Sequence, residues 1–156
     1  TWVRGVASSR NHPYLGDVDI GGDTFIDTLA KASEQAYRKA GITRPREEFD
    51  VVEMYEPCTY AALNWMESLA LCGPGEAGKW VESGATAFDG DLPINPSGGV
   101  LSTNPIGATG LIRVAEAATQ LRGEAGERQV GGAHVAMTTG FGGSNWNEVF
   151  ILDSRA

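Results

Sequence analysis

The chain has 156 residues, of which 42% are hydrophobic, and 20 acidic against 12 basic side chains give it a net charge of −8. This size and apolar content suit one domain with a buried core. The acidic balance, without a cluster of Lys and Arg, argues against nucleic acid or an anionic membrane surface as a partner. No apolar run reaches the roughly 20 residues that span a bilayer, and no signal peptide opens the chain, so we expect a cytoplasmic protein without a membrane span.

Cysteine and histidine are scarce. Cys58 and Cys72 are too few for a disulfide framework, and His12 and His134 are the histidines beside them. This set offers no metal-ligand spacing, so we expect reduced thiols and no bound metal. The chain begins on an apolar, strand-like segment without an initiator methionine, which indicates a piece of a longer protein.

The first elements in chain order are a strand, a loop and a helix. Residues 2–8 alternate apolar and small side chains, as a short strand does, and residues 9–22 read as a polar loop. A helix is predicted over 23–40, with Asp23 or Thr24 as its N-cap. Its apolar stripe recurs at helical spacing and comprises Phe25, Leu29, Ala32, Ala36 and Ala40.

A buried strand and a second helix come next. The short apolar run at 50–54 predicts the strand, and the helix is predicted over 59–71. Its inward side chains are expected to be Ala62, Leu63, Met66, Leu69 and Ala70. Residues 72–92 are Gly-rich and irregular, which is long for a connection without structure and indicates a functional or interface loop.

The second half of the chain contains the clearest helix and two final strands. The helix is predicted over 107–122, with an apolar stripe of Leu111, Val114, Ala115, Ala118 and Leu121. Residues 133–143 and 147–152 predict strands that can pair antiparallel. Because the earlier strands need crossover helices, the sequence predicts an α/β fold with a layered mixed sheet and covering helices.

The segment "INPSGGVLSTNPIGATG", residues 94–110, places glycines and two Asn-Pro steps before that helix. Its backbone N–H groups and small side chains let a ligand approach closely, and the positive end of the helix favours an oxyanion there. The alternative is that the glycines only serve turn geometry and that Thr109 or Asn104 merely caps the helix.

This segment, followed by "QLRGEAGERQVGGAHVA", resembles the C-terminal half of the thiolase superfamily, above all the sterol-carrier-protein-type thiolases and the lipid-transfer thiolase-like enzymes. The resemblance implies that residues 1–156 form a thiolase-like C-terminal domain. The N-terminal half, which carries the cysteine nucleophile in the family, would be a missing segment or a separate chain. The implied substrate is a coenzyme A thioester, and no covalently bound cofactor is expected.

The resemblance also implies site residues. Asn104 stands at the histidine of the family's Gly-His-Pro loop; its amide can donate to a thioester oxygen but carries no proton at neutral pH. An ungapped match sets Tyr55, Glu56 and Cys58 within the His-Asp-Cys-Phe segment of the sterol-carrier type, with Cys58 one place out of register. Cys58 is thus either an acid/base group after a local shift or a buried structural thiol.

Glu56 is likewise either a general base or an acid that caps the second helix. Among the small residues, Gly107, Gly142 and Gly143 are expected to line the substrate site. The acid/base cysteine of the common thiolases is absent, since threonines stand in its segment at 138–139.

Three activities remain open. An acyltransferase of lipid or aromatic acid metabolism would make or cleave a carbon–carbon bond beside a thioester, with Tyr55 and Asn104 holding the oxygen. The segment "YEPCT" is similar to that of thiolase-like retro-aldolases acting on β-hydroxyacyl-CoA side chains of steroids, although Phe141 replaces their second tyrosine. The altered positions also allow a non-catalytic scaffold subunit. The implied partners are a second such unit, giving a dimer, and a small OB-fold and zinc-ribbon protein.

Overall fold

The computed structural model describes residues 1–10, 25–142 and 146–155. Its sheet has the strand order β1-β4-β3-β2 and comprises β1 (Trp2–Arg10), β2 (Val51–Glu53), β3 (Val135–Gly142) and β4 (Trp146–Asp153). β4 runs antiparallel to β1 and β3, whereas β2 and β3 are parallel. The predicted mixed sheet is therefore confirmed, including the antiparallel pairing of the last two strands.

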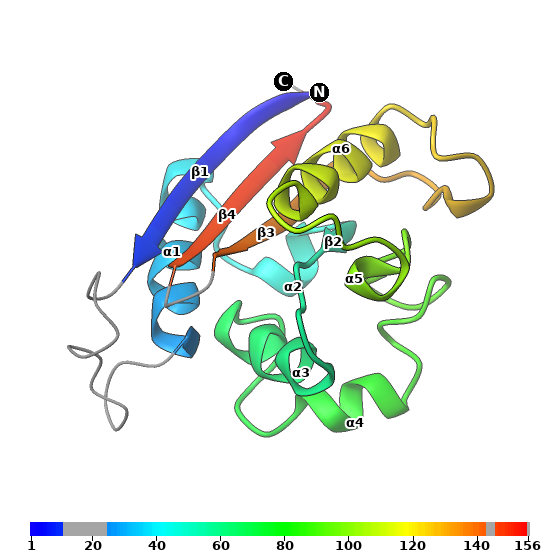
Figure 1. Cartoon of the computed structure of the whole chain (residues 1–156). Helices are drawn as coiled ribbons and strands as arrows, with labels where there is room; N and C mark the ends of the chain where they lie inside the picture. The colour runs from blue at the N-terminus through cyan, green and yellow to red at the C-terminus, as the bar shows by residue number, and fades with distance from the viewer. Residues whose placement is uncertain (11–24, 143–145, 156) are drawn as a thin grey trace.

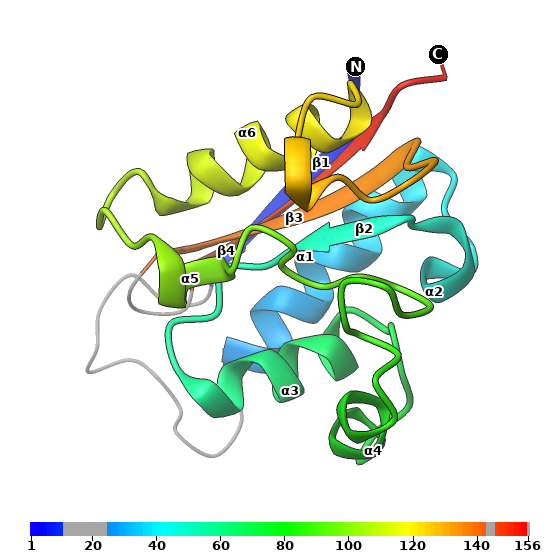
Figure 2. The same cartoon turned by 90° about the vertical axis from the view of Figure 1, so that its right-hand side faces the viewer.

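Helices cover both faces of the sheet (Figures 1 and 2). On one face α1 (Phe25–Ala40) packs against β1 and β4, and α3 (Thr59–Ser68) packs beside α1. On the other face α6 (Thr109–Leu121) crosses β3 and β2. Short turns of helix occupy the connections, namely α2 (Pro45–Glu48), α4 (Ala77–Glu82), α5 (Gly99–Ser102) and the 3-10 turn η2 (Gly126–Arg128).

The buried stripe of α1 matches the prediction over the described side chains: Leu29, Ala32, Ala36 and Ala40 all lie in the core. The loop predicted from residue 9 was wrong at its start, since β1 continues to Arg10. Residues 11–22 of that loop, the N-caps Asp23 and Thr24, and the side chain of Phe25 lie outside the described residues. Small side chains on this stripe let α1 approach β1 closely. Gly5 of β1, which has no side chain, lies at this close contact.

Replacing Gly5 with valine is expected to lower the free energy of unfolding by roughly 1–3 kcal/mol, because extra carbon atoms in a packed contact force α1 away from β1. A Cβ at Gly5 would lie 2.8 Å from the carbonyl oxygen of Ala36 and 3.0 Å from the Cβ of Ala40. Urea denaturation of the assembled protein measures the loss. At Gly78, in α4, a Cβ meets no atom within 4 Å, so Gly78→Ala should be neutral or stabilising. Equal losses for both variants would contradict the packing explanation.

The prediction for α3 was partly wrong. Leu63 and Ala70, expected to point inward, are exposed. The side chains that reach the core are Ala61, Trp65, Met66 and Leu69. The helix also ends at Ser68 instead of residue 71, since Ala70 has a φ of 54°, a left-handed conformation that terminates helices.

The predicted stripe of α6 was wrong in direction for most of its residues, although Leu121 is buried as predicted. The buried side chains of this helix are Thr109, Arg113, Ala117, Gln120 and Leu121. Most of the predicted stripe is exposed or half-buried, and Leu111 is 72% exposed. Polar side chains can face inward because each has a partner: Arg113 pairs with Glu53, and Gln120 bonds the backbone at 128 and 130. The described residues therefore leave an apolar face of α6 uncovered.

The stretch at 72–92, predicted to be irregular, contains α4 and contributes to the core through Ala77, Trp80 and Leu92. The guanidinium of Arg46 lies 4.9 Å from the centroid of the Trp80 ring. Trp80 is thus a core aromatic and does not line the pocket described below. No helix among the described residues is long and apolar enough to cross a membrane.

Candidate active site

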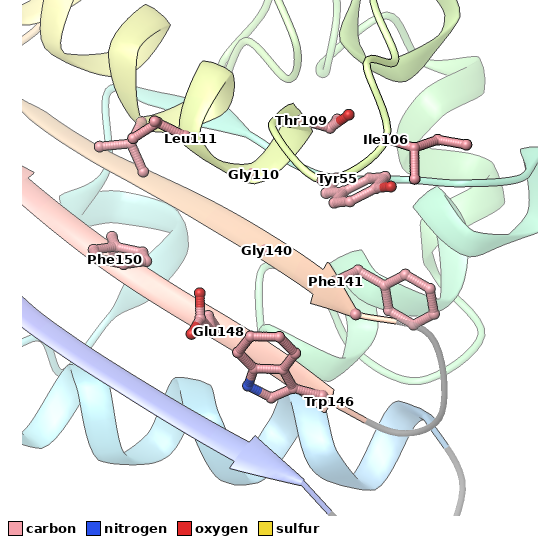
Figure 3. A pocket seen from close by; sticks show the side chains of 13 residues that line it. Tyr55, Ile106, Thr109, Gly110, Leu111, Gly140, Phe141, Trp146, Glu148 and Phe150 are labelled. Carbon is pink, nitrogen blue, oxygen red and sulfur yellow. The ribbon is translucent and has the colours of Figure 1, made fainter.

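A pocket of about 570 Å³ opens between the start of α6 and the adjoining ends of β3 and β4 (Figure 3). Most of its wall is apolar, from Ile106, Leu111, Val114, Phe141, Trp146 and Phe150. Among the described residues that line the pocket, the charged one is Glu148, and Tyr55 and Thr109 supply hydroxyl groups. A concave, largely apolar site with a few polar groups is the usual form of a small-molecule site.

Tyr55 lies in this pocket, as a site residue should. It follows β2, and its backbone N–H donates to Thr139 Oγ1 over 2.9 Å, which attaches this segment to β3. Its ring meets Phe141 edge-on, with ring centroids 5.9 Å apart. Figure 3 shows the phenol beside Ile106. The ring of Tyr55 is therefore held by its neighbours at the wall of the pocket.

Asn104 does not line the pocket but contacts a residue that does. The buried Thr109 hydroxyl donates to Asn104 Oδ1 over 2.8 Å; Thr109 lines the pocket, whereas Asn104 is exposed. Ala108 is the N-cap residue of α6, and Thr109 uses its hydroxyl on the amide instead of capping. Because the bond uses the amide oxygen, the NH₂ group of Asn104 keeps its hydrogens for another acceptor.

Glu56 and Cys58 do not belong to the pocket lining. Glu56 Oε1 accepts the backbone N–H of Val100 over 2.9 Å, so this carboxylate holds the first turn of α5. The predicted alternative, a cap on the second helix, was wrong, since the described residues give α3 no side-chain cap. Burial raises its pKa, against the hydrogen bond from Val100. Cys58 is exposed just before α3, so the expectation of a buried structural thiol was wrong. Catalytic roles for both residues remain predictions.

Two of the three expected glycines belong to the pocket lining. Gly107 and Gly142 line it, whereas Gly143 lies outside the described residues. Gly110 and Gly140 also line it, where α6 crosses β3. A Cβ on Gly110 would lie 3.5 Å from the Cα of Gly140, in ordinary van der Waals contact.

Sequence reasoning missed a buried charged cluster one helical turn beyond Thr109. Arg113 is 1% exposed and Glu53 is fully buried, and Arg113 Nη1 lies 3.1 Å from Glu53 Oε2. Ser97 joins them: its hydroxyl donates to Glu53 over 2.7 Å and accepts from Arg113 over 2.8 Å. Burial raises the pKa of Glu53 to about 7, although Ser97 and Arg113 oppose the shift. A glutamate inside the apolar run "DVVEM" was the available signal.

Glu53 is expected to make the protein less stable as pH rises. Its folded-state pKa of about 7 exceeds the usual 4.5, so the folded chain binds more protons than the unfolded chain between these values. Its contribution is complete below the unfolded pKa and is lost as pH rises through the folded pKa, by up to about 3 kcal/mol. Urea unfolding between about pH 4 and pH 8 should show this slope, and Glu53→Gln should flatten it.

The control for this pH dependence is Glu82→Gln, since Glu82 is an exposed carboxylate on α4. This variant should keep the slope of the unsubstituted protein. The same slope with and without the Glu53 carboxyl would contradict the assignment.

Among the described residues, no three His, Cys, Asp or Glu side chains lie close enough to hold a metal ion.

The fold and this site define a thiolase-like domain. The family model described as "Thiolase C-terminal domain-like" matches residues 18–154, and the chain belongs to this family. The resemblance seen in the Asn-Pro-Ser-Gly-Gly and Gly-Ala-Thr-Gly segments is therefore confirmed.

Known relatives include an acetyl-CoA acetyltransferase of Methanothermobacter thermautotrophicus, 39% identical over 133 residues, which make up 85% of this chain and 34% of that protein. Sterol carrier protein 2 of Bos taurus is 43% identical over 122 residues, 76% of this chain and 22% of that protein. The benzoylsuccinyl-CoA thiolase subunit BbsB of Thauera aromatica is 35% identical over 137 residues, 86% of this chain and 34% of that subunit. The chain thus spans about a third or less of these proteins.

A solved structure described as "Ltp2-ChsH2(DUF35) aldolase" has a similar fold, with a TM-score of 0.76 over 98% of this chain and 39% of that chain. Its sequence identity of 21% supports the fold alone. The α/β architecture and the mixed sheet are therefore those of a thiolase-like protein.

Proposed function

We propose that this chain is the C-terminal half of a thiolase-type acyltransferase, which makes or breaks a carbon–carbon bond beside the thioester carbonyl of an acyl-CoA. The observation that carries the proposal is that Tyr55 and Thr109 line one pocket, and that the Thr109 hydroxyl bonds the Asn104 amide. A phenol O–H and an amide N–H can both donate to a thioester or enolate oxygen, and the positive end of α6 adds to this stabilisation. Relatives named as an acetyltransferase and a thiolase support a CoA thioester as substrate.

The proposed enzyme needs an N-terminal half, as a preceding segment or a separate chain. Neither cysteine of this chain lines the pocket, so the other half supplies the nucleophile. Apolar side chains beside the pocket support such a partner: Leu111 is 72% exposed, Trp146 45% and Val6 40%. Side chains of this kind favour burial against another surface. A dimer of such units, a small OB-fold and zinc-ribbon partner, and a cytoplasmic location remain predictions.

In the proposed reaction, the cysteine of the other half attacks an acyl-CoA carbonyl and the CoA thiol leaves. An enolate from a second thioester then attacks the acyl carbon and releases the cysteine. Asn104 donates to the oxygen that gains negative charge, while Tyr55 holds the neighbouring oxygen or passes it a proton. Asn104 cannot itself transfer a proton at neutral pH, so proton removal falls to Tyr55 or to a group on the other half.

Retro-aldol cleavage of a β-hydroxyacyl-CoA is the second candidate, and the position of Tyr55 favours it. A phenolate there would accept the hydroxyl proton as the carbon–carbon bond breaks, and no acyl-enzyme would form. Against this candidate, Phe141 packs on the Tyr55 ring where a second phenol would be expected. A scaffold subunit is the third possibility.

Intact mass spectrometry of the native assembly after incubation with an acyl-CoA tests these candidates. Acyl transfer predicts a partner half and an acyl adduct on one of its cysteines. An unmodified assembly that releases an aldehyde or ketone from a β-hydroxyacyl-CoA would support the retro-aldolase and exclude transfer. An assembly that binds no acyl-CoA and turns over neither substrate would exclude both enzymes and support the non-catalytic scaffold subunit.

A further inference from the structure

The segment that presents Asn104 has little packing of its own. All residues from 101 to 108 are exposed, including Leu101 at 92% and Ile106 at 89%. An exposed segment holds one geometry only if its ends are fixed, because each free residue costs backbone entropy to order. The position of Asn104 therefore depends on the hydrogen bonds that anchor this segment.

Several anchors join the start of the segment to the end of β2. Asn95 Oδ1 accepts the backbone N–H of Met54 over 2.6 Å, and Glu56 accepts that of Val100 over 2.9 Å. Both contacts join the segment only to the residues that directly follow β2. They do not set the distance between this segment and α6, where Thr109 holds Asn104.

Ser97 makes the connection to both elements. Its backbone N–H donates to Glu53 Oε1 over 3.0 Å, and its hydroxyl donates to Glu53 Oε2 over 2.7 Å. The same hydroxyl accepts from Arg113 Nη1 over 2.8 Å and from the backbone N–H of Gly99 over 3.2 Å. One oxygen thus joins β2, α6 and the first residue of α5.

We infer that Ser97 is a positioning residue: its hydroxyl fixes the segment 97–108 that leads into α6, and thereby the place of the Asn104 amide beside Thr109. The inference rests on the proposed function, because it assigns Ser97 a role in presenting the proposed oxyanion donor. Ser97 acts through Glu53 and Arg113 and does not touch the substrate. These two charges are themselves buried, so they form a rigid support for the hydroxyl.

Ser97→Ala in the native assembly tests this inference, since it removes one oxygen and leaves the ion pair in place. If the amide acts mainly in the transition state, kcat for the acyl-CoA reaction should fall roughly 10- to 100-fold while KM changes less than about threefold. Ser97→Thr keeps the hydroxyl and should restore most of the rate. Ser83→Ala, at an exposed serine that ends α4 away from the pocket lining, is the matched control and should leave kcat unchanged.

Hydrogen–deuterium exchange provides a measurement that does not need turnover. Ser97→Ala should speed exchange in peptides covering 98–108 and leave β3 unchanged. Faster exchange across the whole chain, or an unchanged kcat in an active assembly, would overturn the positioning role. If the unsubstituted assembly turns over no acyl-CoA, the proposed function fails by itself, and local against uniform exchange still decides whether Ser97 positions this segment.

Discussion

Replacing Arg113 with methionine is expected to lower the free energy of unfolding by about 3–5 kcal/mol at about pH 8, because it leaves the carboxylate of Glu53 buried without a positive partner. Both side chains are almost completely inaccessible, and their contact of 3.1 Å connects α6 to β2. Urea denaturation followed by tryptophan fluorescence measures the change. At about pH 5 the loss should be smaller, since Glu53 is then protonated and has less charge to bury.

Two control variants separate this explanation from a general effect of losing an arginine. Arg44→Met removes the exposed partner of Glu47 and should cost less than about 1 kcal/mol, as surface pairs do. The double variant Glu53→Leu/Arg113→Met replaces the buried pair by apolar side chains and should recover much of the loss. A double variant as unstable as Arg113→Met would show that the uncompensated charge is not the cause.

Replacing Tyr55 with phenylalanine is expected to reduce turnover of the acyl-CoA by roughly 10²- to 10⁴-fold, the range for loss of a proton-transferring group. The change removes one oxygen and keeps the ring that packs on Phe141, so unfolding in urea should be little affected. Steady-state kinetics of the native assembly measures kcat and KM. A large fall in kcat with an unchanged urea midpoint would assign the effect to the phenol oxygen.

Tyr60→Phe is the matched control for that experiment. Tyr60 is 65% exposed on α3 and does not line the pocket, so its variant should turn over substrate at the unsubstituted rate. If Tyr55→Phe is as active as Tyr60→Phe, the phenol has no part in the reaction. Proton transfer would then fall to a group on the other half, and Tyr55 would be a packing residue of the pocket wall.

Local sequence patterns were sufficient to predict an element when each of its faces meets either the apolar core or solvent. Alternation predicted β1, a short apolar run predicted β2, a glycine turn between two apolar segments predicted β3 and β4, and helical spacing predicted α1. Short elements escaped: α2 and α5 have four residues each, too few for a period to appear. For the candidate site, the family motifs led to Tyr55, Gly107 and Gly142, all of which line the pocket.

The sequence by itself determined the order of the elements, the family and the glycine-rich start of α6. Only the tertiary structure decided which face of α6 points inward, because periodicity shows that a helix has an apolar stripe but not which surface will cover it. It also decided that Ser97, Glu53 and Arg113 meet, although 60 residues separate Glu53 from Arg113 and 16 separate Ser97 from Arg113. Such contacts depend on the path of the chain between them, and a buried charge is stable only where that path brings its partner within hydrogen-bonding distance.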